Sequence, residues 1–326
     1  MANPDPQLVD RFRRDLAALG HDEERLGLAV SGGPDSLALL LLAAAAFPGA
    51  VEAATVDHGL RAEAAAEAEM VAGLCRALGV PHVILHVDVA AGGTGLQGEA
   101  RRARYAALAE WAGAQGLALL ATAHHADDQA ETILMRLQRG AGLAGLAAIR
   151  PVRAEGPDLA VVRPLLGWSR AELASVVAAA GVDAADDPSN RDPRFDRVRM
   201  RAFLAANPEF QPARLARSAA ACREADDALA WAAAQLADDR INEQGGEWRI
   251  DPEGLPRAIA RRLLLAVLAQ IREAHALPAP PGTEDVEGLL AALEAGEAGT
   301  LGGVMGRGGR FWHLRLAPPR RPVSAR

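Results

Sequence analysis

The chain of 326 residues is long enough for one large domain or two of ordinary size, and half of its residues are hydrophobic, so material for a core is ample. Its net charge of −7 excludes a uniformly basic nucleic-acid-binding protein, although it leaves room for local basic patches. All 35 basic residues are arginine, which excludes Schiff-base chemistry on a lysine of the chain.

Cysteine usage and the N-terminal segment indicate the compartment. Cys75 and Cys222 stand far apart and form no CxxC pair, which argues against a disulfide framework or a zinc site and favours a reducing environment. The first residues are charged and lack the apolar core of a signal peptide. The longest apolar run, 37–47, is too short to cross a bilayer. We therefore expect a cytoplasmic protein with no membrane association.

The first part of the chain alternates short apolar runs with helical patterns. Buried strands are expected at 26–30, 51–56, 83–87 and 117–121, and helices at 36–47, 62–78 and 97–114. Repeated βα units predict an α/β fold with a Rossmann-like parallel sheet and helices on both of its faces. Ligands of such sheets bind where the strands end, so the segments after the strands should converge on one edge.

A glycine pair follows the first predicted strand and precedes a helix rich in alanine and leucine. Glycine adopts positive φ readily, and a helix N-terminus presents free N–H groups to an anion. The hydroxyls of this segment add donors, and the carboxylate of Asp35 is suited to Mg²⁺ bound through pyrophosphate oxygens. The alternative is a plain turn in which Ser36 or Asp35 caps the helix. The candidate phosphate-binding residues are Ser31, Gly32, Gly33, Pro34, Asp35 and Ser36.

This loop has no lysine after its last glycine, so it is not a Walker A loop. It matches SGGxDS and resembles the loop of the PP-loop ATP pyrophosphatases, which split ATP between its α- and β-phosphates.

Two later strand ends carry further candidates. Asp57 is placed to contact an adenosine ribose, or else to cap a helix. If a helix begins near His124, then His124, Asp128 and Glu131 share one face. That group could bind a divalent ion, act as acid and base, or hold a cationic amine; the alternative is an ordinary acidic first turn. Arg139 ends the same helix and could contact nucleotide phosphate or cap the C-terminus.

The pattern weakens after Pro151. A further strand is expected within 161–166, a capping box at Ser169–Glu172 opens a helix that ends at Ala180, and 186–195 reads as a loop. Helices are expected at 212–239, 256–274 and 284–295, and a hairpin with glycine turns at 302–316. The sequence therefore predicts a domain at 1–207 and a smaller, mainly helical domain at 208–326.

A dense group of arginines lies near the end of the first of these two domains. Solvated helix faces and phosphate contact are both open interpretations for it. Its members are Arg191, Arg194, Arg197, Arg199 and Arg201.

Together these segments resemble the bacterial tRNA(Ile)-lysidine synthases over most of the chain. The resemblance rests on SGGPDS at 31–36, VDHGLR at 56–61, ARRARY at 100–105, ATAHHADDQAET at 121–132, RLQRGAGLAGL at 136–146, RPLL at 163–166 and DDPSN at 186–190 with the arginines that follow. Members of this family adenylate the C2 carbonyl oxygen of the wobble cytidine in the CAU anticodon of tRNA(Ile), and free lysine then attacks C2 and displaces AMP.

The resemblance implies roles and partners. ATP is a co-substrate bound by Ser31–Ser36, with Mg²⁺ at Asp35, and further nucleotide contacts come from Asp57 and Arg139. Arg104, His124, Asp128 and Glu131, with Asp35, match lysine-binding or catalytic positions. The partners would be tRNA(Ile) with a CAU anticodon, contacted by Arg194, Arg197, Arg199, Arg201 and the domain at 208–326, and free L-lysine; the chain is also compatible with a homodimer.

Other functions remain open at this level. A tRNA thiolase or an amidating NAD or GMP synthetase would use the same loop, although thiolation usually needs the paired cysteines that this chain lacks. An adenine-nucleotide sensor would bind ATP without releasing pyrophosphate. A structural tRNA-binding protein fits the acidic net charge least well.

Overall fold

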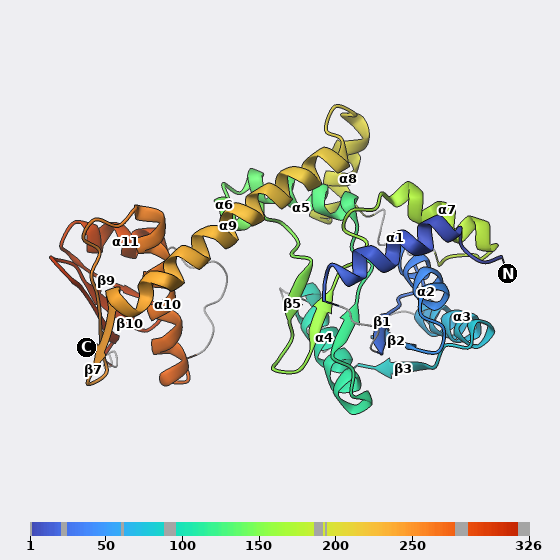
Figure 1. Ribbon diagram of the computed structural model, residues 1–326, viewed down its shortest axis with the longest axis horizontal. Helices are drawn as coiled ribbons and strands as arrows, with labels where there is room; N and C mark the ends of the chain where they lie inside the picture. Colours follow the sequence, from blue (N-terminus) through green and yellow to red (C-terminus); the bar gives the residue numbers. More distant parts are fainter. Residues whose placement is uncertain are drawn as a thin grey trace, which may run out of the picture. The chain divides into compact units, whose positions relative to one another are not determined.

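The computed structural model describes residues 2–20, 25–59, 62–87, 96–185, 192, 194–277 and 286–318. The chain divides into two compact units, Met1–Arg223 and Glu224–Arg326 (Figure 1). The division falls inside the long helix α9 (Pro212–Arg240), whereas the sequence analysis placed the boundary after residue 207.

The first unit is built on a six-stranded sheet. Its strand order is β3-β2-β1-β4-β6-β5, with β1 Leu26–Ala29, β2 Val51–Asp57, β3 His82–His86, β4 Leu119–Ala121, β5 Val152–Ala154 and β6 Ala160–Val162. All neighbours are parallel except β5 and β6. Leu26 of β1 pairs with Val51 on one side and with Leu119 on the other, so β1 is central. The predicted parallel sheet is confirmed, and β5 is an additional antiparallel edge strand.

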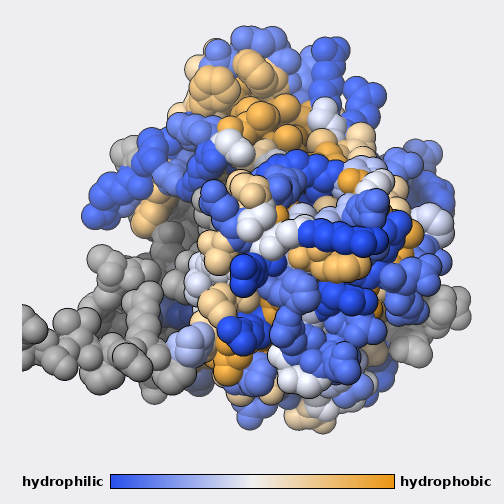
Figure 2. All heavy atoms as spheres, turned by 90° about the vertical axis from the view of Figure 1, so that its left-hand side faces the viewer, coloured by the Kyte–Doolittle hydropathy of each residue, from blue (hydrophilic) through white to orange (hydrophobic). Residues whose placement is uncertain are grey.

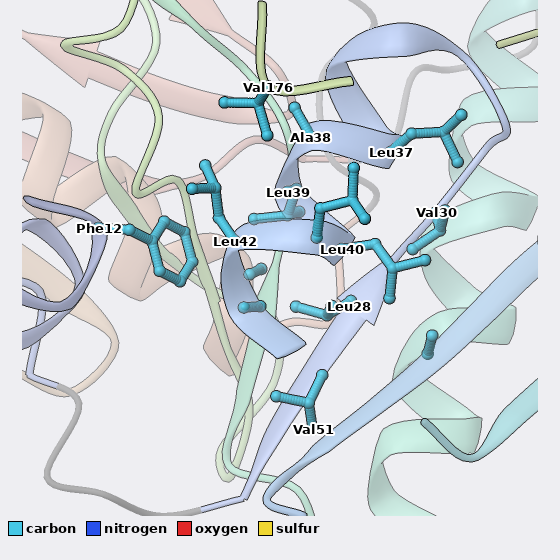
Figure 3. Packing of buried hydrophobic residues seen from close by; sticks show 14 of the residues in the cluster. Phe12, Leu28, Val30, Leu37, Ala38, Leu39, Leu40, Leu42, Val51 and Val176 are labelled. Carbon is cyan, nitrogen blue, oxygen red and sulfur yellow. The ribbon is translucent and has the colours of Figure 1, made fainter. Parts of the chain in front are cut away.

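Alternate residues of the strands face two separate cores. On one face, α1 (Pro6–Ala17), α2 (Pro34–Ala46), α3 (Ala62–Leu78) and α7 (Arg170–Ala180) contribute to the larger core. Figure 3 shows α2 side chains between Leu28 of β1, Phe12 of α1 and Val176 of α7. The helix α2 is apolar almost all round because it is buried there. On the other face, α4 (Leu96–Gln115) packs Leu108 and Trp111 against the sheet.

The helix after β4 begins later than the sequence analysis expected. α5 spans Ala126–Gln138, and its N-cap is His125. His124 therefore lies outside the helix, and the face expected to join it with Asp128 and Glu131 does not form. α5 packs against α8 (Asp196–Ala206), and the short α6 (Leu143–Leu146) follows α5.

The second unit combines helices with an antiparallel sheet. α10 (Arg257–Ala274) and α11 (Val286–Glu294) accompany strands β7 Ile241–Gln244, β8 Glu247–Ile250, β9 Ala298–Leu301, β10 Val304–Arg307 and β11 Trp312–Leu316, in the order β7-β8-β11-β10-β9. The expected hairpin is confirmed as β10–β11, but a complete sheet was not anticipated. Alternation explains the sheet, since Trp248, Ile250 and Leu314 are buried against the helices while their neighbours are exposed.

Figure 2 looks at the molecule from the side of this second unit, and hydrophilic residues predominate over the visible surface.

Gly302 and Gly303 join β9 to β10 with φ of 53° and 81°, the two positive angles that a tight two-residue hairpin turn requires. Among the helices of the described ranges, none has the length and apolar character needed to cross a bilayer.

Candidate functional site

The loop between β1 and α2 has the form of an anion cradle. Gly32 has φ of 87°, a left-handed conformation that favours glycine, and Gly33 is the extended N-cap of α2 with no side-chain cap. The expectation of positive φ thus holds for Gly32 only. Pro34 occupies the first turn of the helix, where no N–H is needed. The N-terminus of α2 therefore keeps uncapped N–H groups that can donate to an anion.

Hydroxyl groups fix the shape of this loop. Ser36 is buried, donates its hydroxyl to the Gly33 carbonyl (2.9 Å) and accepts from the Ser31 N–H (3.1 Å). Its Oγ also lies 3.3 Å from the Ser31 Oγ. The Gly32 carbonyl accepts from the N–H of Ala185, which ties the loop to the segment after α7. The loop is held by its own side chains and backbone before any ligand binds.

Asp35 joins this loop to the end of β4. Its Oδ2 lies 3.3 Å from Nε2 of His125, so the expected convergence of the two strand ends is confirmed. Its Oδ1 is buried and has no hydrogen-bond partner. A buried carboxylate oxygen without a partner is unfavourable unless a ligand meets it, and Mg²⁺ prefers such oxygens together with substrate phosphates. The residues present therefore fit a magnesium ion bound beside a nucleotide.

His125 lies among three carboxylates. Besides Asp35, its ring lies 3.5 Å from both Asp127 and Asp128, and its side chain is only 1% exposed. Burial opposes the charge, but hydrogen bonds with Asp127 and Asp35 and the charges of Asp128 and Asp35 prevail and raise the pKa of His125 to about 9. The raised pKa favours the charged ring among these acids, whereas the backbone N–H of Asp127, 3.2 Å from Nδ1, can donate only to the neutral ring, so protonation of the ring breaks this cap bond.

Two of the three carboxylates around His125 are themselves anchored by the backbone. Asp128 accepts from the His125 backbone N–H (3.1 Å), and Asp127 accepts from the Arg170 N–H (2.9 Å). Burial raises the pKa of Asp127, but the hydrogen bond from His125 and contacts with Arg170 outweigh it and lower the value to about 2. Asp127 is therefore charged at neutral pH, and the backbone holds both carboxylates in a fixed orientation beside the ring.

Glu131 is directed away from this group. Its side chain is 1% exposed, and its Oε1 pairs with Arg201 of α8 (3.1 Å) and with Arg170 of α7 (3.4 Å). Its Oε2 is buried without a partner. Glu131 thus connects three helices, and one oxygen stays available.

His124 faces the opposite electrostatic environment. Its Nδ1 lies 2.9 Å from the Thr122 hydroxyl. Burial, reinforced by Arg163, Arg197 and other arginines, lowers its pKa well below the ordinary value. Two adjacent histidines therefore differ in charge preference: the raised pKa of His125 favours its charged form, and the lowered pKa of His124 favours its neutral form.

We call the arginines next to His124 the arginine basin. They surround Tyr105, whose ring lies 5.0 Å from the Arg101 guanidinium, 5.4 Å from that of Arg104 and 4.6 Å from that of Arg153. Arg163, the fourth member, is buried at the end of β6 and donates to the Arg150 carbonyl. Burial alone would raise the pKa of Tyr105, but these arginines lower it.

The remaining candidates lie around these groups. Asp57 is buried and accepts from the Gly59 N–H (2.9 Å), which forms a local turn at the end of β2. Arg139 is exposed at the end of α5 and pairs with Asp196. Arg199 also pairs with Asp196, whereas Arg194 pairs with Asp192 and Arg197 is exposed. The DDPSN segment, Arg191 and Arg61 lie outside the described residues.

Sequence reasoning did not single out three central residues. It singled out His124, but His125 is the histidine that contacts Asp35. The residue pattern offers one signal, since His125 begins the Asp-rich turn as an N-cap. Arg163 stands in the RPLL segment but was not singled out, and Arg153 had no local signal; both reach the basin from the region of β5 and β6, far along the chain from 100–105.

Comparisons with known proteins agree with this geometry. The PP-loop domain family matches residues 5–207. A tRNA(Ile)-lysidine synthase of Zymomonas mobilis is 46% identical over 301 residues, covering 91% of this chain and 90% of the relative. One of Novosphingobium aromaticivorans is 48% identical over 318 residues, covering 96% and 95%. The U34-tRNA thiolase NcsA of Methanococcus maripaludis has a similar fold, with a TM-score of 0.55 at 17% identity over 67% of this chain and 78% of that one.

Proposed function

The chain belongs to the tRNA(Ile)-lysidine synthase family of PP-loop enzymes, and on that basis we propose that it ligates free lysine to the wobble cytidine of tRNA(Ile) with a CAU anticodon. The C2 carbonyl oxygen of the cytosine attacks the α-phosphorus of ATP and pyrophosphate leaves. The lysine Nε then attacks C2, loses a proton, and AMP leaves with the oxygen. One observation carries the proposal: Asp35 of a PP-loop meets the acid-rich turn of His125 in a chain that matches these synthases nearly end to end.

The loop at Ser31–Ser36 would hold the ATP phosphates. The uncapped N–H groups of α2 and the positive end of its dipole favour negative charge there, and Gly32 lets phosphate approach the backbone. Asp35 would hold Mg²⁺, which neutralises charge on the leaving pyrophosphate. His125 would fix the Asp35 carboxylate through the 3.3 Å contact and so orient its free oxygen.

The carboxylates of Asp35, Asp127 and Asp128 form an anionic corner that would receive the lysine side chain. Asp128 is 14% exposed and lies at the N-terminus of α5, where its carboxylate can accept a hydrogen bond from an ammonium group. The amine must lose a proton before it attacks, and a carboxylate nearby can take that proton. Glu131, with one unpartnered oxygen beside Arg201, would link this corner to the arginines of α8.

Asp57, at the end of β2, would contact the ribose, and Arg139 the nucleotide phosphates. The exposed arginines of α8 and of the turn before it would contact the tRNA, as would residues 208–326.

The test combines the protein with ATP, Mg²⁺, labelled lysine and a tRNA(Ile) transcript with a CAU anticodon. A matched transcript with the wobble cytidine replaced by uridine is the control. We expect label on the first RNA alone, together with AMP and pyrophosphate in equal amounts.

Three other results would contradict the proposal. Pyrophosphate without label on RNA would keep the PP-loop chemistry and indicate another acceptor. Equal label on both transcripts would exclude the wobble cytidine. Binding of ATP without any pyrophosphate would indicate a nucleotide sensor.

A further inference from the structure

The arginine basin concentrates positive charge that the chain itself does not neutralise. Among the described residues, Glu155 is the one acidic side chain that pairs with a member of the basin, at Arg153. The arginines of α8 and α7 differ, because Arg199, Arg201 and Arg170 all have carboxylate partners. The basin is therefore a place where an anion from outside gains more than it would beside these three paired arginines.

The floor of the basin contains polar atoms that lack partners. Tyr105 and Arg163 are each only 4% exposed, and the Tyr105 hydroxyl and the Arg163 Nε form no hydrogen bond. Buried polar groups are nearly always satisfied in folded proteins, so the unpartnered Arg163 Nε beside the other basin arginines indicates a ligand with acceptor oxygens.

The rim of the basin is open to solvent. The Arg153 side chain is 41% exposed, and Arg101 is exposed as well. Both guanidinium groups lie over the Tyr105 ring; Arg153 also pairs with Glu155, and the N–H groups of Arg101 can donate to a ligand. Exposed guanidinium groups beside buried donors suit an anionic group that belongs to a larger molecule.

We propose that the arginine basin binds a phosphodiester group of the RNA substrate, in the single-stranded stretch beside the reacting base. The inference rests on the proposed function, because it takes RNA as the substrate. His124 and His125 are consecutive, so the basin and the anionic corner lie on adjacent residues. A backbone phosphate held in the basin would place its nucleotide next to Asp35 and Asp128.

Charge disfavours the carboxylate of lysine beside Arg101, Arg153 and Arg163, while Arg104 keeps the lysine-binding or catalytic role that the resemblance implies. Free lysine carries an α-ammonium beside its carboxylate, and that ammonium would enter a hollow lined by four arginines and one paired glutamate. A phosphodiester carries one negative charge and no positive one. Guanidinium groups also match its two free oxygens in a bidentate manner.

The experiment measures tRNA binding in the absence of ATP and lysine, with Arg101→Gln, Arg153→Gln and the double variant. The control is Arg102→Gln, which removes the same charge from the neighbouring position of α4, where the side chain is 80% exposed. We expect each basin variant to weaken binding of the CAU transcript about tenfold, as the loss of a charge-assisted hydrogen bond predicts. The slope of log Kd against log salt should fall by about 0.7 for each lost contact. ATP affinity should stay unchanged and shows that each variant is folded.

Steady-state kinetics then shows whether the basin binds the RNA phosphodiester or the carboxylate of lysine. The basin variants should raise the KM for tRNA and leave the KM for lysine unchanged. A higher KM for lysine with unchanged tRNA binding would assign the basin to the lysine carboxylate and overturn the proposal. Equal weakening by Arg102→Gln would also overturn it, because the effect would not be local. If the wild-type protein binds tRNA but transfers no lysine, the proposed function fails while the basin proposal is still decided by the binding data.

Discussion

Loss of the proton from His125 should destabilise the α/β unit by about 3 kcal/mol. The pKa of the buried ring is about 9, against 6.5 in an unfolded chain. Each unit of difference corresponds to about 1.4 kcal/mol of linked stability. Because the folded-state pKa is raised, this stabilisation is complete below pH 6.5 and is lost as the pH rises through 9. Between pH 7.5 and pH 10 about 2 kcal/mol should disappear.

The assay compares the wild type with His125→Gln, whose side chain is polar and never charged. Urea unfolding at pH 7.5 and pH 10 can be followed by pulse labelling of Cys75, which is buried in this unit. The difference in unfolding free energy between the two proteins should shrink by about 2 kcal/mol at the higher pH. His82→Gln is the matched control, since burial lowers the pKa of His82 and its ring is neutral at both values. If the His125→Gln difference is the same at both pH values, the imidazolium assignment is refuted.

Three further predictions concern single side chains. Asp35→Asn should keep the fold and lower the rate of pyrophosphate release at least about 100-fold, because the amide cannot hold Mg²⁺ as a carboxylate does; a rate within threefold of wild type would remove Asp35 from the mechanism. Glu131→Gln should lower the unfolding free energy by about 1–2 kcal/mol in the same urea assay, since it leaves Arg170 and Arg201 partly unpaired, whereas Asp196→Asn at an exposed pair should change it by less than about 0.5 kcal/mol. Burial raises the pKa of the Cys75 thiol to about 12, so an alkylating reagent at pH 8 should modify Cys222 and spare Cys75 until urea unfolds the unit; equal rates in the folded protein would contradict the burial.

Much of the fold follows from local patterns. The βα alternation predicted the parallel sheet because buried strands and helix-forming segments differ in length and period. The capping box at Ser169 and Glu172 predicted the start of α7, and it forms with both hydrogen bonds. The strands of the second unit were largely missed, since Ile241–Gln244 is mostly polar and Ala298–Leu301 is short and contains glycine, and the two become strands by pairing with β8 and β10.

The candidate site was predictable only where it is continuous in sequence. The SGGPDS motif identifies the phosphate-binding loop directly. Its contact with the turn after β4 was predictable because β1 and β4 are parallel neighbours whose ends meet at the same edge of the sheet. The sequence did not show whether His124 or His125 would be the N-cap of α5 and contact Asp35, because no local pattern encodes that contact. The basin joins α4, β5 and β6, so its arginines are related only in the folded chain. The roles of the individual site residues and the homodimer stay predictions.

The two adjacent histidines limit how this connection can vary in length. In extended backbone, which His125 adopts, consecutive side chains point to opposite sides. A deletion or insertion of one residue between Thr122 and Ala126 would exchange the two rings. The ring facing the acids would then turn toward the arginines, and its neutral neighbour would replace it beside Asp35. Relatives that keep both environments should therefore have a connection of unchanged length between strand and helix, even where its other side chains differ.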